Sequence, residues 1–240
     1  MKYIKSISLL LVLLFCGIYV SAQTADEIIT KYQQVMGGKE ALQKINSVYT
    51  ESKFEVMGME GIGKTTLLNG KGQRQDIDIM GSTITTCYND KGGWSLNPMT
   101  GSTVAEAMPE QQYKSGKDQI FVGGPFFHYP ENGYKAELLG SEAVDSIKAL
   151  KLKMTSPDST SSIYYFDSVT GLLVKSIAQM DVQGQISDIE IRLSDYRQAD
   201  GFMTPWKMEM NIPSVQFAMT NTVTKIEINN PVDTAFFAKP

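Results

Sequence analysis

The sequence predicts a mainly β protein with a few helices (α+β), built on one antiparallel sheet of about eleven to twelve strands. Near the C-terminal end, polar and apolar residues alternate with period two, and Trp206, Met208 and Met210 share one strand face. Glycine and Asn/Asp turns separate the alternating runs, so neighbouring strands are expected to form hairpins. A clear helical pattern opens the chain between residues 24 and 45.

Residues 1–22 have the pattern of a secretory signal peptide. Two lysines precede a short apolar run, and small residues at Ser21 and Ala22 provide a cleavage site before Gln23. Lipidation at Cys16 is the alternative, but the preceding Leu-Leu-Phe places a bulky ring where such sites need a small residue. We therefore expect a soluble secreted protein that begins at Gln23.

The expected mature chain, residues 23–240, has the length of a single domain. Its net charge is −6, because cleavage removes Lys2 and Lys5 from a chain of net charge −4. An acidic chain is a poor candidate for binding nucleic acid. Cys87 is the one cysteine left after cleavage, so no intramolecular disulfide is expected, and its strand-like surroundings indicate a packed thiol.

The first helix is expected to begin at Thr24, because Glu27 three residues later completes a capping box. Gly37 and Gly38 end it, and residues 39–45 follow as a second short helix. Strands are then expected at residues 48–57, 62–68, 73–80, 83–88, 93–96, 134–139, 147–155, 161–167 and 172–182, followed by the alternating runs at 185–197, 202–212 and 215–228.

Residues 105–121 interrupt the strand pattern and are expected to include a short helix after Pro109. The next segment, residues 121–130, is an aromatic loop with two glycines and two prolines. Such an apolar loop either plugs one end of the core or covers a binding site as a lid. At the C-terminus, Phe236 and Phe237 are expected to anchor the chain end.

Motifs that carry catalytic or nucleotide chemistry are weak in this chain. Residues 58–65 match the P-loop pattern, but a glycine-rich turn follows where the helix should begin, so a hairpin is expected and no nucleotide. His128 is the single histidine, which excludes the usual histidine metal sites and leaves no triad motif. Carboxylate pairs such as Asp76 with Asp78 and Asp188 with Glu190 are typical of solvated strand faces. We expect no cofactor, no metal and no catalysis.

The remaining candidate is an apolar surface rich in methionine, a side chain that adapts to varied apolar partners. We expect this strand face to form the wall of a cavity, with the aromatic loop over its mouth; a filled core is the alternative. The candidate ligand-binding residues are Trp94, Phe121, Phe126, Phe127, Trp206, Met208 and Met210.

Several turn and packing motifs of the mature chain resemble LolA-like proteins, the outer-membrane lipoprotein-sorting family of Gram-negative bacteria. They are Thr24-Ala-Asp-Glu-Ile-Ile-x-Lys-Tyr, Gly37-Gly38-Lys39-Glu40, Gly93-Trp94-Ser-Leu-Asn97-Pro98-Met99-Thr100-Gly101, Asp195-Tyr196-Arg197 with Asp200-Gly201 and Pro205, and Ile228-Asn229-x-Pro231. The resemblance implies an open, strongly curved antiparallel half-barrel closed by helices around an apolar cavity. In the founding carriers, that cavity receives the acyl chains of lipoproteins crossing the periplasm.

The resemblance and the apolar surface together lead to one expected function. The chain is expected to be a non-enzymatic periplasmic carrier for lipoprotein acyl chains or another lipid-like ligand. The alternative is an envelope scaffold or stress-sensor domain that contacts a partner protein, such as an envelope membrane protein.

Overall fold

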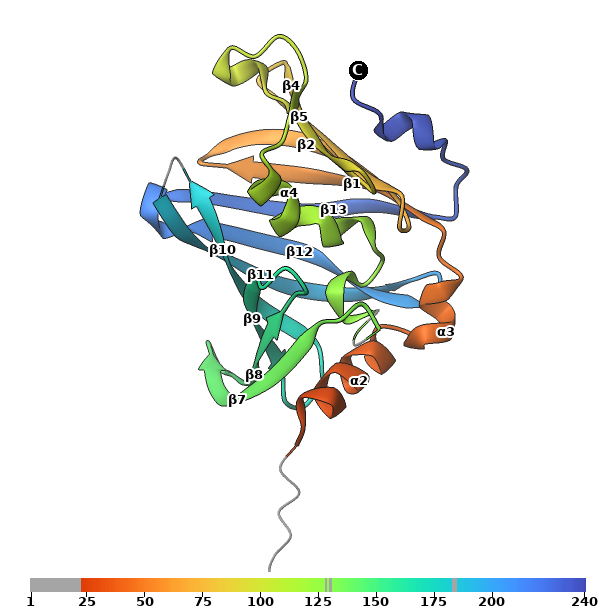
Figure 1. Ribbon diagram of the computed structural model, residues 1–240, viewed down its shortest axis with the longest axis vertical. Coiled ribbons are helices and arrows are strands. Elements are labelled where there is room, and N and C mark those ends of the chain that lie inside the picture. The colour runs from red at the N-terminus through yellow and green to blue at the C-terminus, as the bar shows by residue number, and fades with distance from the viewer. Residues whose placement is uncertain (1–22, 128, 130, 183–184) are drawn as a thin grey trace, which may run out of the picture.

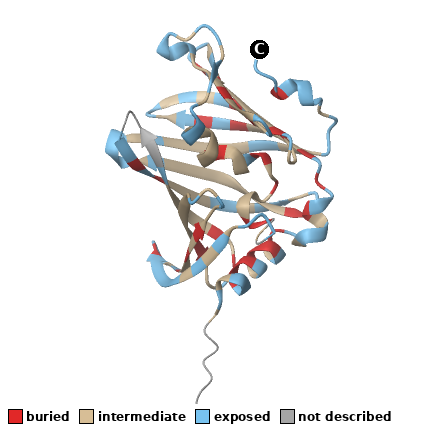
Figure 2. Ribbon diagram, viewed as in Figure 1, coloured by how far each residue is buried: buried red, intermediate tan, exposed pale blue. Residues whose placement is uncertain are grey.

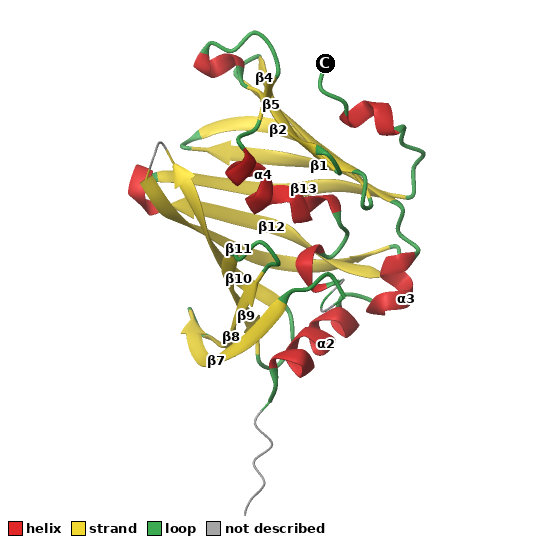
Figure 3. Cartoon of the chain, viewed as in Figure 1, coloured by secondary structure: helices red, strands yellow, loops and turns green. Residues whose placement is uncertain are grey.

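The computed structural model describes residues 23–240 except 128, 130 and 183–184 (Figure 1). The predictions for the signal segment, Cys16 and His128 therefore lie outside the described residues. The described residues form a single antiparallel sheet of thirteen strands. A few helices accompany the sheet (Figure 3). The strands are β1 (Ser47–Val56), β2 (Met59–Leu68), β3 (Gly72–Ile79), β4 (Ser82–Asn89), β5 (Gly92–Leu96), β6 (Glu106–Ala107), β7 (Lys135–Val144), β8 (Ile147–Thr155), β9 (Ser161–Asp167), β10 (Leu173–Val182), β11 (Gln185–Ala199), β12 (Phe202–Ile212) and β13 (Phe217–Ile228).

The sheet consists of two meanders that meet in the middle. Strands β1 to β6 run outward to one edge, and β7 to β13 return from the other edge until β13 pairs with β1. A crossover segment links the two edges and contains α4 (Glu110–Gly116) and the 3₁₀ turns η2 (Lys117–Ile120) and η3 (Gly124–Phe126). The described strands β6 and β7 do not pair, so the sheet stays open rather than closing into a barrel.

The position of α4 shows how strongly the sheet curves. This helix contacts both β5 and β10, although seven strands separate these two in the sheet order. In a flat sheet they would lie about 38 Å apart, whereas seven helical residues span only about 10 Å. The sheet therefore bends around the crossover segment, and the predicted half-barrel is confirmed.

The N-terminal helices begin and end largely as the sequence predicts. In α2 (Ala25–Val35), the Thr24 hydroxyl accepts a hydrogen bond from the Glu27 amide at 3.2 Å, and the Glu27 carboxylate accepts one from the Thr24 amide at 2.9 Å. Helix α3 (Gly38–Gln43) follows after Gly37, whose φ of 119° is accessible mainly to glycine.

The main core lies on the face of the sheet that carries α2 and the crossover segment, which we call the inner face. There the ring of Phe126 packs edge-on against Tyr32, Tyr164 and Phe166 at centroid distances of 5.2, 4.7 and 5.3 Å. Figure 2 shows the buried residues of α2 and of the nearby strands. The fully buried residues of this cluster include Ile28, Ile29, Leu42, Leu152 and Phe166.

A smaller core lies on the opposite, outer face of the sheet. Residues 229–240, which we call the C-terminal strap, carry Phe237 onto Cys87 and Trp94. The Phe237 ring lies so close to Gly72 that a β-carbon there would stand 2.4 Å from it. Phe237 is 2% exposed and provides the expected anchor, whereas Phe236 is 40% exposed. Cys87 is a buried free thiol.

One strand appears where the sequence predicts no strand. The two-residue strand β6 lies within residues 105–121 and pairs with β5 through Trp94 and Ala107. Its two residues are too few for any periodicity to register. The expected short helix after Pro109 is present as α4.

The P-loop-like segment, residues 58–65, forms the β1–β2 turn and most of β2, as expected for a hairpin. Because Lys64 is exposed on β2, we expect Lys64→Ala to change the free energy of unfolding by no more than about 0.5 kcal/mol. Urea denaturation measures this change. ATP binding by the parent protein that disappears in the variant would contradict the hairpin interpretation.

Candidate functional site

The structure places the seven candidate binding residues in four separate regions. Trp94 lies in the outer-face core, where it is 3% exposed and its Nε1 donates a hydrogen bond to the Phe237 carbonyl at 3.1 Å. Phe126 and Phe127 lie in the main core, 3% and 4% exposed. Phe121 borders a hollow of about 300 Å³ between the crossover segment and neighbouring strand turns.

The other three candidates, Trp206, Met208 and Met210, lie on β12 and are partly exposed. The guanidinium carbon of Arg197 lies 4.5 Å from the centre of the Trp206 ring. Strand pairing puts Met210 opposite Ile191 on β11 and opposite Met219 on β13. The side chains of Ile191, Met210 and Met219 therefore share one face of the sheet.

Register shows that this face is the inner one. Reading across the sheet, Ile191 pairs with Ser176, Ser176 with Tyr164, and Tyr164 with Leu152, which is fully buried in the main core. In the other direction the same line of pairs continues through Val56 to Met59. We call the partly exposed end of this line the methionine row: Met59, Val56, Met219, Met210 and Ile191.

A second line of paired residues runs beside the methionine row. It consists of Phe54, Asn221, Met208 and Leu193 on four adjacent strands. Neither the methionine row nor this second line contains a charged side chain. The inner face therefore offers an uncharged, mostly apolar strip that is buried at the α2 end and partly exposed at the other.

Three buried polar atoms in and beside this apolar surface have no hydrogen-bond partner among the described residues. Ser52, two residues before Phe54 on the same face of β1, is 1% exposed, and its hydroxyl oxygen has no hydrogen-bond partner among the described residues. The side-chain oxygen of Asn221 is likewise buried without a described partner, as is Nε1 of Trp206.

The crossover segment is fastened to its surroundings by polar contacts. Gln33 of α2 donates a hydrogen bond to the Phe126 carbonyl at 2.6 Å, and the Gly70 amide donates one to the Ile120 carbonyl at 2.7 Å. The Val122 amide donates to the side-chain oxygen of Asn69 at 3.1 Å. The segment is thus attached both to α2 and to the β2–β3 turn.

Two carboxylates connect η2 to the residue before β7 and to the β8–β9 turn. Their environments shift their pKa values in opposite directions. Burial raises the pKa of Asp118, which accepts a hydrogen bond from the Tyr134 hydroxyl at 2.5 Å. A hydrogen bond from Ser156, together with the Lys117 ammonium 2.9 Å away, lowers the pKa of Asp158 to about 2. The Asp158 carboxylate therefore stays charged at neutral pH.

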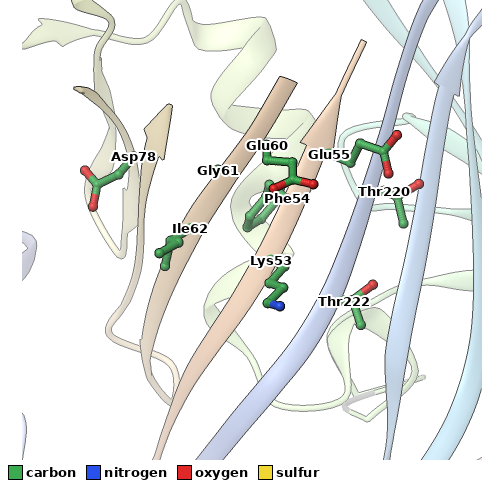
Figure 4. Close-up of a pocket in the computed structure, with 9 residues that line it drawn as sticks. All are labelled: Lys53, Phe54, Glu55, Glu60, Gly61, Ile62, Asp78, Thr220 and Thr222. Carbon is green, nitrogen blue, oxygen red and sulfur yellow. The ribbon is translucent and has the colours of Figure 1, made fainter. Parts of the chain in front are cut away.

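A second hollow has a different character. It encloses about 590 Å³ on β13, β1, β2 and β3, and Figure 4 shows charged side chains around it. Most of its lining points to the outer face, because Lys53 pairs with Thr222 and Glu55 with Thr220, and these alternate along β1 with the inner residues Ser52 and Phe54. A hollow lined by Glu55, Glu60 and Asp78 is unsuited to an apolar ligand.

The described residues contain no group of three or more His, Cys, Asp or Glu side chains that could hold a metal ion. They also contain no helix long and apolar enough to cross a membrane.

Comparison with known proteins gives fold relatives but no sequence relatives. No protein-family model matches the sequence, and no curated protein matches it. Among solved structures, a LolA superfamily protein from Nitrosomonas europaea matches with a TM-score of 0.58 and 15% identity, over 91% of this chain and 99% of that one. The chain has the LolA-like fold.

Two further structures agree with the LolA-like fold. A DUF1329 family protein from Desulfovibrio piger matches with a TM-score of 0.58 and 13% identity, over 89% of this chain and 95% of that one. A domain described as an outer membrane lipoprotein-sorting protein from Vibrio parahaemolyticus matches with a TM-score of 0.56 and 12% identity, over the same shares. The resemblance inferred from the turn and packing motifs is thus confirmed for the fold.

The candidate residues predicted from the sequence include Met210 of the methionine row and Met208 of the line beside it, but no other member of the row. Met59, Val56 and Ile191 lie on three other strands, and their alignment with Met210 depends on strand register. Hydrophobic alternation within each strand assigns a face, but it does not show which residues face each other across strands.

Proposed function

We propose that this LolA-like chain is a non-enzymatic periplasmic carrier that binds the acyl chain of a lipoprotein or another lipid-like molecule along its inner face. The observation that supports this most directly is the partial exposure of the methionine row. A sheet face used only for packing would have its apolar residues buried, as Leu152 and Phe166 are at the other end.

The composition of the row suits a flexible hydrocarbon chain. Methionine side chains are unbranched and adjust to ligands of varied shape. Burial of each methylene group contributes about 0.8 kcal/mol, so each added carbon should tighten binding by up to roughly fourfold until the strip is filled. This ligand class is consistent with the description of the structurally similar domain from Vibrio parahaemolyticus as an outer membrane lipoprotein-sorting protein.

A charge placed in the methionine row tests the proposal. We expect Met210→Asp to weaken binding of a fluorescent fatty-acyl probe by at least about tenfold, because the new carboxylate would be buried against hydrocarbon. Fluorescence titration of the probe measures the change.

The matched control is Asn211→Asp, which adds the same charge to the same strand. Asn211 is exposed and pairs with Glu190 and Ala218 on the outer face, so probe affinity should stay unchanged. No probe binding by the parent protein, or equal loss in both variants, would reject the carrier proposal.

A further inference from the structure

Within the proposed binding face, Ser52 and Asn221 form a polar pair with unused hydrogen-bonding capacity. Register places Ser52 opposite Val223 and Asn221 opposite Phe54, so the two polar side chains are diagonal neighbours on β1 and β13. Diagonal neighbours on one sheet face lie about 7 Å apart.

Ser52 is a buried residue, whereas Asn221 is partly exposed and buries its Oδ1 atom. Ser52 is 1% exposed, and neither its Oγ nor Asn221 Oδ1 has a partner among the described residues. A buried polar atom without a partner is costly. Neighbouring strands provide little compensation, since Ser52 faces Gly63 on β2 and Asn221 faces Met208 on β12.

We propose that this pair is a recognition subsite for an uncharged amide group in a long-chain ligand, a proposal that rests on the carrier function. The Ser52 hydroxyl donates to the ligand carbonyl oxygen, and Asn221 Oδ1 accepts from the ligand N–H. In an amide, the C=O and the N–H point in opposite directions. A donor to the C=O and an acceptor from the N–H therefore stand roughly 8 Å apart, close to the spacing of diagonal neighbours such as Ser52 and Asn221.

The subsite distinguishes ligand classes by simple chemistry. An ester has the carbonyl but no N–H, so it satisfies Ser52 and leaves Asn221 Oδ1 unpaired. A free carboxylate brings a charge into an apolar face, and neither paired line on this face contains a cation to compensate it.

The test uses three probes of equal chain length: a primary fatty amide, the methyl ester and the free acid. Each displaces a fluorescent acyl probe from the full mature protein. We expect the amide to bind about tenfold more tightly than the ester, the ratio typical of one hydrogen bond to a buried partner.

Two variants test separately the donor role of Ser52 and the acceptor role of Asn221. Asn221→Leu keeps the side-chain size and should make the amide and ester bind equally. Ser52→Ala should weaken both to a similar extent and keep the preference for the amide. Neither should unfold more readily than the parent, since each removes an unpartnered polar atom. Thr222→Val, beside Asn221 on the outer face, should change nothing.

The outcomes distinguish this subsite from the carrier function itself. If the parent binds amide and ester equally, or if the amide preference survives in Asn221→Leu, the subsite proposal is wrong while the carrier function stands. Failure of all three probes to displace the acyl probe would reject both proposals.

Discussion

Phe126→Ala is expected to lower the free energy of unfolding by about 3–5 kcal/mol, the cost of truncating a buried aromatic ring. Phe126 is 3% exposed and contacts three other aromatic rings, one from α2 and two from β9. Its removal would leave a cavity at the point where the crossover segment meets α2. Urea denaturation followed by circular dichroism measures the loss.

The size of this loss distinguishes a plug from a lid. A lid that opens for ligand contributes little to global stability, because such segments belong to the least stable parts of a fold. A loss below about 1 kcal/mol would therefore contradict the packed arrangement. Val169→Ala, in a turn where the side chain is 83% exposed, is the control and should change stability by less than about 0.5 kcal/mol.

Local sequence patterns predicted the elements of this fold because each depends on residues close together in the chain. Thr24 and Glu27 are three residues apart, and their capping box forms as expected. The alternation around Met208 and Met210 likewise places both on one strand face, and the motif at residues 58–65 forms a hairpin.

The site was harder to predict because it depends on pairing between distant strands. Phe54 and Asn221 face each other across β1 and β13, although most of the chain lies between them. No local pattern reports that pairing, which also decides that Ser52 lies beside Asn221. Trp94 shows the same limit: its strand is predicted, but the strap that covers it comes from the far end of the chain.

The aromatic loop illustrates a different limit. Its composition shows that Phe126 and Phe127 must be shielded from water, but it does not identify the shielding partner. That partner is α2, through packing with Tyr32 and the hydrogen bond from Gln33. The sequence shows the amphipathic pattern of α2 and the apolar composition of the loop. It does not show that the two touch, because the crossover segment brings the loop to α2 only in the folded sheet.

Removing the Phe237 ring should make Cys87 reactive. Burial raises the pKa of the Cys87 thiol to about 12, and the residue is 0% exposed beneath the C-terminal strap. The thiolate is the reactive form, so at pH 8 the folded protein should react with a thiol reagent about a thousandfold more slowly than an exposed cysteine. In Phe237→Ala, solvent would reach the thiol and much of that protection should disappear. The lost ring should also lower the free energy of unfolding by about 3–5 kcal/mol.

Phe236→Ala is the matched control, since the neighbouring ring is 40% exposed, lies 4.7 Å from the Arg74 guanidinium and meets the Phe237 ring edge-on at a centroid distance of 5.6 Å. Its labelling rate should stay close to that of the parent. Measuring the rates at several low urea concentrations separates local release of the strap from global unfolding, because only global unfolding accelerates steeply with denaturant. Equal protection in both variants would contradict shielding of Cys87 by the Phe237 ring. The protection would then come from β4 and β5 or from the strap backbone, where the Phe237 carbonyl accepts hydrogen bonds from Trp94, Asn89 and Cys87.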